Sequence, residues 1–468
     1  MSSSEALMNE EIVQADENVK EGKSEEKLGI GKLLAWSLRS GSTGVAIMVI
    51  GFLTVFCTDT LGIDARIVGT LLLASKLLDG ITDLLAGFIV DKTNTKLGKA
   101  RPYELCIIGL WAATVGLFMC PASFSTAMKC VWIFIMYALV NSVFLTFLNA
   151  NNTAYMVRAF SNQKHYVALS TYGGLVPMII VVAFNIVFPM LMGTMATSQS
   201  GWVKLVLIFA IPLTFLGLLR FIFIKETNNV DVKSGEKLEL NHVFTVLKRN
   251  PYIYIIALTT LIFNLITNMG VNVYYFTHIV GNVGLMGVLA AIQIVALPMM
   301  FILPKVLKRT TVAKVISVGI VVIIIGYLIN FFAYDNFPLL AFGNVLTGAG
   351  AVPISMLISL LIIDCAEYNE YKGMQRLEGS LSAVNGFAQK LGAGLGSGLF
   401  GILIGITGYN GTLATQPDSA ITMIRLLYSL IPAALYALVF VSFRFYKLDA
   451  LMPEIRKANE AEHSVKKG

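Results

Sequence analysis

Four ionisable residues interrupt stretches of this chain that are otherwise apolar enough to cross a membrane: Lys76, Asp79, Asp83 and Lys390. A charge at mid-bilayer depth costs about 2.5–3.5 kcal/mol on the most lenient scale, so membrane proteins keep one mainly where it faces a partner, an ion or water. The first three are spaced i, i+3 and i+7, which places them on one face of a helix. Two carboxylates one turn apart, with cationic groups within reach, predict a site for a small cation or a proton.

The composition is that of a membrane protein with many spans. Of the 468 residues, 56% are hydrophobic and 13% are charged, which is about half the charged fraction of a soluble protein. Roughly 20 consecutive apolar residues cross a bilayer. We therefore expect an all-α polytopic membrane protein with about twelve spans, at 35–58, 66–90, 102–122, 130–155, 166–190, 202–224, 251–279, 284–304, 312–334, 338–363, 380–407 and 421–445.

The net charge of +7 does not indicate a nucleic-acid partner, because the basic residues are concentrated in alternate loops. This asymmetry is the positive-inside pattern, and it predicts a multi-pass protein of the cell (inner) membrane with both termini in the cytoplasm. The loops concerned contain Lys92, Lys96, Lys99 and Arg101; Arg158 and Lys164; Lys225, Lys233, Lys237, Lys248 and Arg249; Lys305, Lys308, Arg309 and Lys314; and Lys372 and Arg376.

The longest polar interruption between spans divides the membrane region into two similar halves. It predicts a cytoplasmic linker at 225–249 between six-helix bundles at 31–224 and 250–446, a layout found in transporters built from repeated halves. Residues 1–30 are polar and carry no apolar signal-peptide core, so we expect a disordered cytoplasmic tail there. A second cytoplasmic tail is expected at 447–468.

The sequence offers no sign of an enzyme or of a bound cofactor. The five cysteines form no CxxC or Cys/His cluster, and we find no nucleophile–base set, metal cluster or phosphate loop. His278 is expected near the outer surface without a partner cluster, which argues against a metal role. Aromatic residues toward span ends are predicted to lie in interfacial belts, and these include Trp111, Trp202, Tyr274 and Tyr275.

Two segments resemble a known transporter family. The first runs from Thr58 to Tyr103 and ends GFIVDKTNTKLGKARPY, and the second is DCAEYNEYKGMQRLEGSLSAVNGFAQKLGAGLGSGLF, with GITGY shortly after it. Together they resemble the glycoside–pentoside–hexuronide:cation symporters, the melibiose-permease group of the major facilitator superfamily. The resemblance implies a twelve-helix alternating-access carrier, expected to act as a monomer, that couples uptake of a small sugar-like molecule to entry of Na⁺ or H⁺.

The resemblance also implies a cation site. Asp79 and Asp83 fall on the family's paired carboxylates, Thr146 on a helix-four hydroxyl that helps to hold the ion, and Lys390 on a helix-eleven lysine near both sites. Thr82 replaces an asparagine that favours sodium in the melibiose carrier, so Na⁺ and H⁺ both stay open. The alternative for the two aspartates is a structural ion pair with Lys76 or Lys390 that only locks helices together.

The substrate side is more neutral than in the melibiose carrier. Two aspartates of that carrier correspond to Thr43 and Asn149, and its sugar-stacking aromatic to Thr153, so galactoside specificity does not carry over. Lys390 is again implied near the substrate. Arg39, close to Thr43, is a candidate for an anionic group such as a uronide. Asn268 shares a predicted helix face with Asn264 and Asn272, facing either a wet cavity or a neighbouring helix.

The loop after the second span resembles the superfamily's cytoplasmic gating motif, with Asp91, Lys92, Lys99 and Arg101 as gate residues. Asp364, Glu367 and Arg376 are the candidates in the second half. An ordinary basic loop is the alternative for the lysines. At the level of the whole protein, the alternatives are a carrier of the same fold for another solute, such as an organic anion or a lysolipid, and a membrane sensor that transports nothing.

Overall fold

The computed structural model describes residues 29–93, 95–160, 165, 169, 173–226, 250–296, 298–373, 378–413 and 415–467. The predicted tail at 1–30 lies almost wholly outside these residues, as do most of the linker at 225–249 and Arg376. Within the described part, the chain is helical and contains no strand, only one isolated bridge between Thr95 and Gly98.

The first half of the chain forms one group of helices. Its elements are α2 (Ile30–Ile50), α3 (Leu53–Val55), η1 (Phe56–Thr60), α4 (Ala65–Lys92), η2 (Arg101–Leu105), α5 (Cys106–Phe118), α6 (Thr126–Ala138), η3 (Leu139–Leu145), α7 (Thr146–Ala159), α9 (Leu175–Met195) and α10 (Gln199–Phe223).

The second half forms the other group and adds a terminal helix. Its elements are α12 (Tyr252–Thr267), α13 (Val271–His278), α14 (Leu285–Gln293), η4 (Ile294–Ala296), α15 (Met299–Leu307), α16 (Val312–Ala333), α17 (Phe337–Tyr371), α18 (Glu378–Ile406), α19 (Asp418–Tyr428), α20 (Leu430–Phe443) and α21 (Leu448–Lys467). The last of these lies in the segment that the sequence predicted only as a tail.

Nine helical segments of the described chain are long and apolar enough to cross a membrane. The helix α4 has the length but is set apart by Lys76, Asp79 and Asp83 within it. Polar side chains at this depth need local partners, so the helix that departs most from the apolar pattern is the one to inspect for a site.

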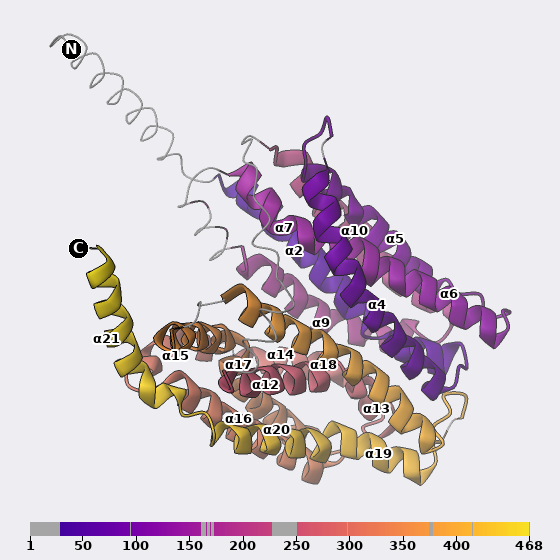
Figure 1. Cartoon of the computed structure of the whole chain (residues 1–468). Coiled ribbons are helices and arrows are strands. Elements are labelled where there is room, and N and C mark those ends of the chain that lie inside the picture. Colours follow the sequence, from indigo (N-terminus) through magenta and orange to yellow (C-terminus); the bar gives the residue numbers. More distant parts are fainter. Residues whose placement is uncertain are drawn as a thin grey trace.

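The two groups of helices meet at one end of the molecule and diverge at the other (Figure 1). The helix α2 begins, and α21 ends, at the diverging end, which we call the terminal face. The opposite end is the far face. The main contact between the groups joins α4 to α18, and a second joins α9 to α14.

Glycines allow the backbones of α4 and α18 to approach closely. A Cβ atom added at Gly401 would lie 2.6 Å from the carbonyl oxygen of Ala65 and 2.8 Å from the Cα atom of Gly69. The α9–α14 contact is equally tight at Gly287, where a Cβ would lie 2.2 Å from the carbonyl oxygen of Ile186. Small residues at such crossings replace side-chain packing with backbone contact, so the two groups are in direct contact toward the far face.

Three irregularities break the helices at polar positions. The segments η1 and η3 are π-helical, a rare geometry that often marks functional sites. The third break lies between α12 and α13, where Gly270 has a φ of +70°. Because the helix stops at Thr267, the prediction that Asn264, Asn268 and Asn272 share one continuous helix face is wrong.

The belt prediction is also wrong for four aromatic residues. Trp111 and Trp202 are 2% and 1% exposed, and Tyr274 and Tyr275 are at most 1% exposed. Each polar tip is hydrogen-bonded, with the Trp111 indole donating to Ser42 and the Trp202 indole to Thr60. Buried aromatic residues with a satisfied polar atom contribute large packing areas, so these rings belong to the core of the bundles.

Candidate functional site

The predicted cation site begins with an ion pair within α4. The Lys76 ammonium lies 3.1 Å from the carboxylate of Asp79, one turn later on the same face of the helix. Asp79 is only 9% exposed, so the Lys76 ammonium compensates the charge of its carboxylate at a position where solvent has little access. Asp83 lies one further turn along α4, and its side chain is outside the described part of the structure.

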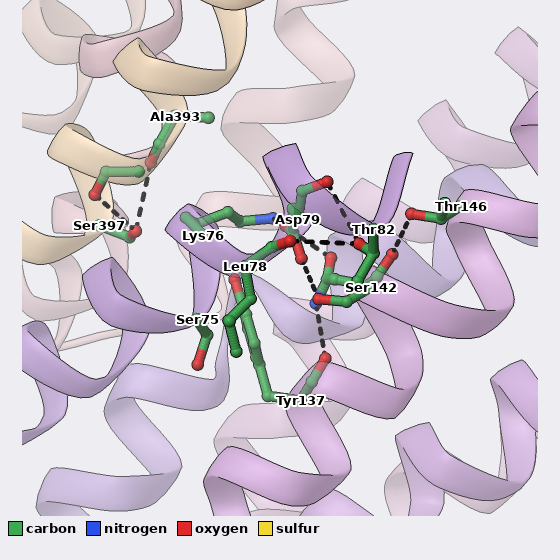
Figure 2. A network of polar contacts seen from close by, with 12 residues as sticks. Ser75, Lys76, Leu78, Asp79, Thr82, Tyr137, Ser142, Thr146, Ala393 and Ser397 are labelled. Carbon is green, nitrogen blue, oxygen red and sulfur yellow. Dashed lines mark hydrogen bonds and ion pairs between the residues drawn. The ribbon is translucent and has the colours of Figure 1, made fainter. Parts of the chain in front are cut away.

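The π-helical segment η3 supplies the other contacts of this pair. Ser142 donates a hydrogen bond to the Asp79 carboxylate, and Lys76 donates to the side-chain oxygen of Asn141 at 3.2 Å. Figure 2 shows the side chains of Lys76, Asp79 and Ser142 converging between the two helices, with Thr146 beyond Ser142. Thr146 is 5% exposed and donates to the main-chain oxygen of Asn141 at 2.9 Å.

This arrangement gathers side-chain oxygen atoms of η3 around the Lys76–Asp79 pair. Asp79, Ser142, Thr146 and the Asn141 amide offer the hard oxygen ligands that small cations prefer. Of these, Asn141 and Ser142 were not among the predicted site residues. A π-helical turn inserts one residue into the helix, and its position in this chain could not be read from the sequence.

Lys390 lies across the boundary between the two groups of helices. It is exposed on α18 and interacts electrostatically with both Asp79 and Lys76. One turn further along α18, a Cβ at Gly394 would lie 3.0 Å from the Cβ of Lys76. The Lys76 stem therefore packs on α18 while its ammonium binds Asp79, so the ion pair adjoins the α4–α18 contact.

The residues predicted for the substrate occupy varied environments. Asn149 on α7 and Asn268 at the end of α12 are exposed. Thr43 is 6% exposed, and its hydroxyl donates to main-chain oxygens of its own helix at Arg39 and Ser40. Thr153 lies on α7, with its side chain outside the described part.

Arg39 belongs to a buried charge cluster that the sequence analysis missed. Its guanidinium lies 3.1 Å from the carboxylate of Glu104, and Arg220 lies 3.6 Å from the same carboxylate. Asn151 donates to Glu104 at 3.1 Å, and the Arg220 guanidinium stacks on the Trp36 ring with 3.2 Å to the centroid. In this conformation Arg39 is 3% exposed and is engaged within its own bundle.

Comparison with known proteins places the chain in a family. The model described as MFS/sugar transport protein matches residues 39–450. The chain belongs to this family. An isoprimeverose transporter of Lactiplantibacillus pentosus is 28% identical over 425 residues, covering 89% of this chain and 88% of the relative. A glucuronide carrier protein homolog of Escherichia coli K12 is 26% identical, covering 85% of this chain and 88% of the relative.

Solved structures agree on the architecture. The nucleoside transporter NupG aligns with a TM-score of 0.58 at 16% identity, covering 89% of this chain and 98% of that one. The xylose transporter XylE of E. coli, in a partially occluded inward-open conformation, aligns at 0.57 and 12%, covering 86% and 96%. Together with the family match, these likenesses confirm the predicted major facilitator fold of a multi-pass membrane protein. Family and fold are those of transporters.

Two of the predicted gate residues, Lys99 and Arg101, lie in a loop that is hydrogen-bonded to the end of the first bundle. The main-chain amides of Lys99, Ala100 and Arg101 donate to the carboxylate of Glu226 at 3.1, 2.7 and 2.6 Å. The Arg101 guanidinium donates to the main-chain oxygen of Phe221 at the end of α10. Asp91 and Lys92 lie at the end of α4, and their side chains are outside the described part.

The gate candidates of the second half are bound by α21. Arg456 lies 2.9 Å from Asp364 and 2.9 Å from Glu367, both on α17. The hydrogen bond to Glu367 raises the pKa of the Arg456 guanidinium, so its charge persists throughout the accessible pH range. Asn459 adds a hydrogen bond to the main-chain oxygen of Glu367 at 3.1 Å. The sequence analysis found the acidic residues but not the helix that binds them.

Proposed function

We propose that the chain is a cation-coupled symporter of a small sugar, a glycoside, pentoside or hexuronide, that works by alternating access. The observation that carries the proposal is the position of Asp79, a nearly buried carboxylate held by Lys76 and Ser142 beside the contact between the two bundles. The names of the relatives, an isoprimeverose transporter and a glucuronide carrier homolog, support the substrate class.

In the proposed cycle, the Lys76 ammonium forms an ion pair with the Asp79 carboxylate when no coupling cation is bound. An arriving cation competes for the carboxylate and releases the ammonium. Because the Lys76 stem packs on α18 at Gly394, this release changes the contact between α4 and α18. Cation binding and the arrangement of the two bundles are then energetically linked, which is the requirement for coupling.

The coupling ion is proposed to be Na⁺ or H⁺. Sodium would draw on Asp79, Asp83, Ser142 and Thr146 as oxygen ligands. A proton would use the two aspartates alone, since neighbouring carboxylates cannot both ionise cheaply. No further cofactor is proposed.

For the substrate we propose a site lined by Thr43, Asn149, Thr153, Asn268 and Lys390, on the terminal-face side of the inter-bundle contact. The exposed amides of Asn149 and Asn268 suit hydroxyl groups, because an amide, like a hydroxyl, both donates and accepts hydrogen bonds. Arg39 would join them only after leaving Glu104. We propose the inner membrane as the location, with the terminal face cytoplasmic and the monomer as the working unit.

The test is transport in proteoliposomes. Sugar counterflow measured with and without Na⁺ at fixed pH identifies both the substrate class and the ion. We expect Asp79→Asn and Asp83→Cys to abolish gradient-driven accumulation while the protein still elutes as a single folded species. Ser75→Ala is the matched control, because Ser75 lies on the same helix and bonds only its own main chain at Leu71 among the described contacts. Undiminished accumulation in both aspartate variants would refute the assignment.

A further inference from the structure

A second polar cluster joins the two bundles toward the far face, away from the candidate cation site. The tyrosine hydroxyl of Tyr409, after α18, lies 2.8 Å from the Asp59 carboxylate on η1 and 3.0 Å from Nε2 of His278 on α13. On the other side of Asp59, the Thr58 hydroxyl lies 2.7 Å from the same carboxylate oxygen and 2.9 Å from the hydroxyl of Tyr274. Asp59 and Thr58 belong to the first bundle, and the three aromatic residues to the second.

Counting hydrogen atoms shows that the hydrogen bonds from Asp59 through Tyr409 to His278 need one more hydrogen than the tyrosine can supply. Tyr409 has a single hydroxyl hydrogen, yet its oxygen lies within bonding distance of the Asp59 carboxylate, which accepts, and of Nε2 of His278, which accepts or donates according to the tautomer. The second hydrogen must sit either on the Asp59 carboxyl or on Nε2 of His278. Both hydrogen bonds of Tyr409 are therefore formed only when Asp59 or His278 carries a hydrogen.

Burial decides which arrangement is favoured. Asp59 is half-buried, and the two hydroxyls that contact its carboxylate, those of Tyr409 and Thr58, belong to side chains that are 6% and 2% exposed and carry no charge. Supplying the hydrogen from a neutral imidazole would leave Asp59 ionised without a cation. A proton taken up by Asp59 or by His278 removes this penalty, because the carboxyl–imidazole pair is then electrically neutral. Such a shared proton belongs to the pair and not to one residue.

The surrounding charges do not offer a substitute. Among the described residues, no ion pair engages Asp59, and its contacts are the hydroxyls already named. Lys129 of α6 reaches the same turn, but its ammonium donates to the main-chain oxygen of Leu61 at 2.9 Å. Asp64 and Arg66, at the start of α4, pair with each other at 2.7 Å.

We propose that Asp59, Tyr409 and His278 form a proton-binding site that is complete only while the bundles touch at the far face. Separation of the bundles divides the site, increases the exposure of Asp59 and His278, which are half-buried in this arrangement, and releases the proton. This inference rests on the proposed alternation between two bundle arrangements but concerns a proton distinct from the coupling ion at Asp79. Because the closed arrangement binds one more proton, its ratio to the open one rises up to tenfold for each unit by which pH falls.

The experiment measures bundle separation and needs no substrate. Spin labels are attached at Met119→Cys and Leu413→Cys, exposed positions on the far ends of opposite bundles, in a chain whose native cysteines are replaced by alanine. Distance distributions between the two spin labels are recorded by double electron–electron resonance between about pH 5 and pH 8, a range that spans carboxyl and imidazole titration. We expect the short-distance fraction to grow as pH falls. A fraction that does not change over this range would overturn the proposal.

Three variants locate the proton. Asp59→Asn is neutral at every pH, so the closed fraction should stay high and lose its pH dependence; the wild-type slope in this variant would overturn the proposal. Tyr409→Phe removes the link and should lower the closed fraction and flatten its response, and wild-type behaviour there would also count against the site. Asp79→Asn should keep the part of the slope that Asp59→Asn removes, because a coupling proton at Asp79 would contribute separately from the proton at Asp59. If Asp79→Asn alone lost it, the proton would lie at the candidate cation site, which would overturn this inference and leave the proposed symport intact.

Discussion

Ser142 donates a hydrogen bond to the carboxylate of Asp79 and thereby joins η3 to α4. The two residues are 63 positions apart in sequence, and both are nearly buried. Asp79 is held on its other side by Lys76. The orientation of one carboxylate thus depends on two helices at once, and the predictions below separate these contributions.

Ser142→Ala should weaken binding of the coupling cation without unfolding the protein. A hydrogen bond to a charged group contributes about 1.5–3 kcal/mol, which corresponds to a loss of roughly tenfold or more in apparent cation affinity. The measurement is the cation concentration that gives half-maximal transport. Ser75→Ala should leave it unchanged, and equal values in Ser142→Ala and wild type would show that this hydroxyl does not support the site.

Lys76→Met should destabilise the cation-free protein by removing the counter-ion of Asp79. Breaking a fully buried pair costs about 3–5 kcal/mol, and the partial exposure of Lys76 reduces this to roughly 2–3 kcal/mol. Thermal unfolding in detergent, with and without the coupling cation, measures the effect. The cation should restore more stability to Lys76→Met than to wild type.

The double variant Lys76→Met/Asp79→Asn is the control for that experiment. It removes both charges, so most of the lost stability should return and the response to the cation should disappear. If the double variant were as unstable as Lys76→Met alone, the lost stability would come from packing of the lysine stem and not from its charge.

Gly401→Leu should hold the bundles apart at the far face. A side chain there would collide with the backbone of α4 at Ala65 and Gly69, and backbone atoms cannot move aside as a flexible side chain can. Solvent accessibility of a thiol introduced near the far face should rise severalfold, and transport should fall. Gly386→Ala is the matched control on the same helix, because a Cβ at Gly386 meets nothing within 4 Å. Equal labelling in the two variants would contradict the prediction.

Arg456→Gln should release α21 from the terminal face with little effect on overall stability. Its side chain is 57% exposed, and exposed ion pairs contribute about 0.2–1 kcal/mol. We expect a change in melting temperature close to the experimental error but faster proteolytic cleavage between α20 and α21. A Glu454→Gln variant on the same helix removes a charge that is exposed and pairs with none of the described residues, and it should keep the wild-type cleavage rate.

Much of the architecture follows from hydropathy, because a lipid environment requires long apolar helices and leaves few alternatives. The same constraint made Asp79 conspicuous, since a carboxylate in such a helix is costly. Its partner in η3 was not predictable in this way. Ser142 resembles any serine in an apolar span, and only the π-helical geometry turns it toward α4.

Charge clusters at the bundle ends were only half predictable. Asp364 and Glu367 were predicted as gate candidates, but their partner Arg456 is 92 residues away from Asp364 in sequence and lies in a segment that was predicted only as a tail. Arg39 and Glu104 are likewise brought together by packing between α2 and η2, across 65 positions. Pairings over such separations depend on how helices cross, which local sequence patterns do not encode.

The extra residue that makes η3 π-helical has a consequence for how this carrier can diversify. One residue removed from Leu139–Leu145 would restore an ordinary α-helix and rotate everything before it relative to α7 by about 100°. The side chains of Ser142 and Asn141 would then both turn away from α4, without any change to the Asp79 carboxylate itself. On the proposed cation site, a single-codon deletion would therefore be enough to change ion preference among descendants of such a protein, a route that comparisons restricted to aligned positions would overlook.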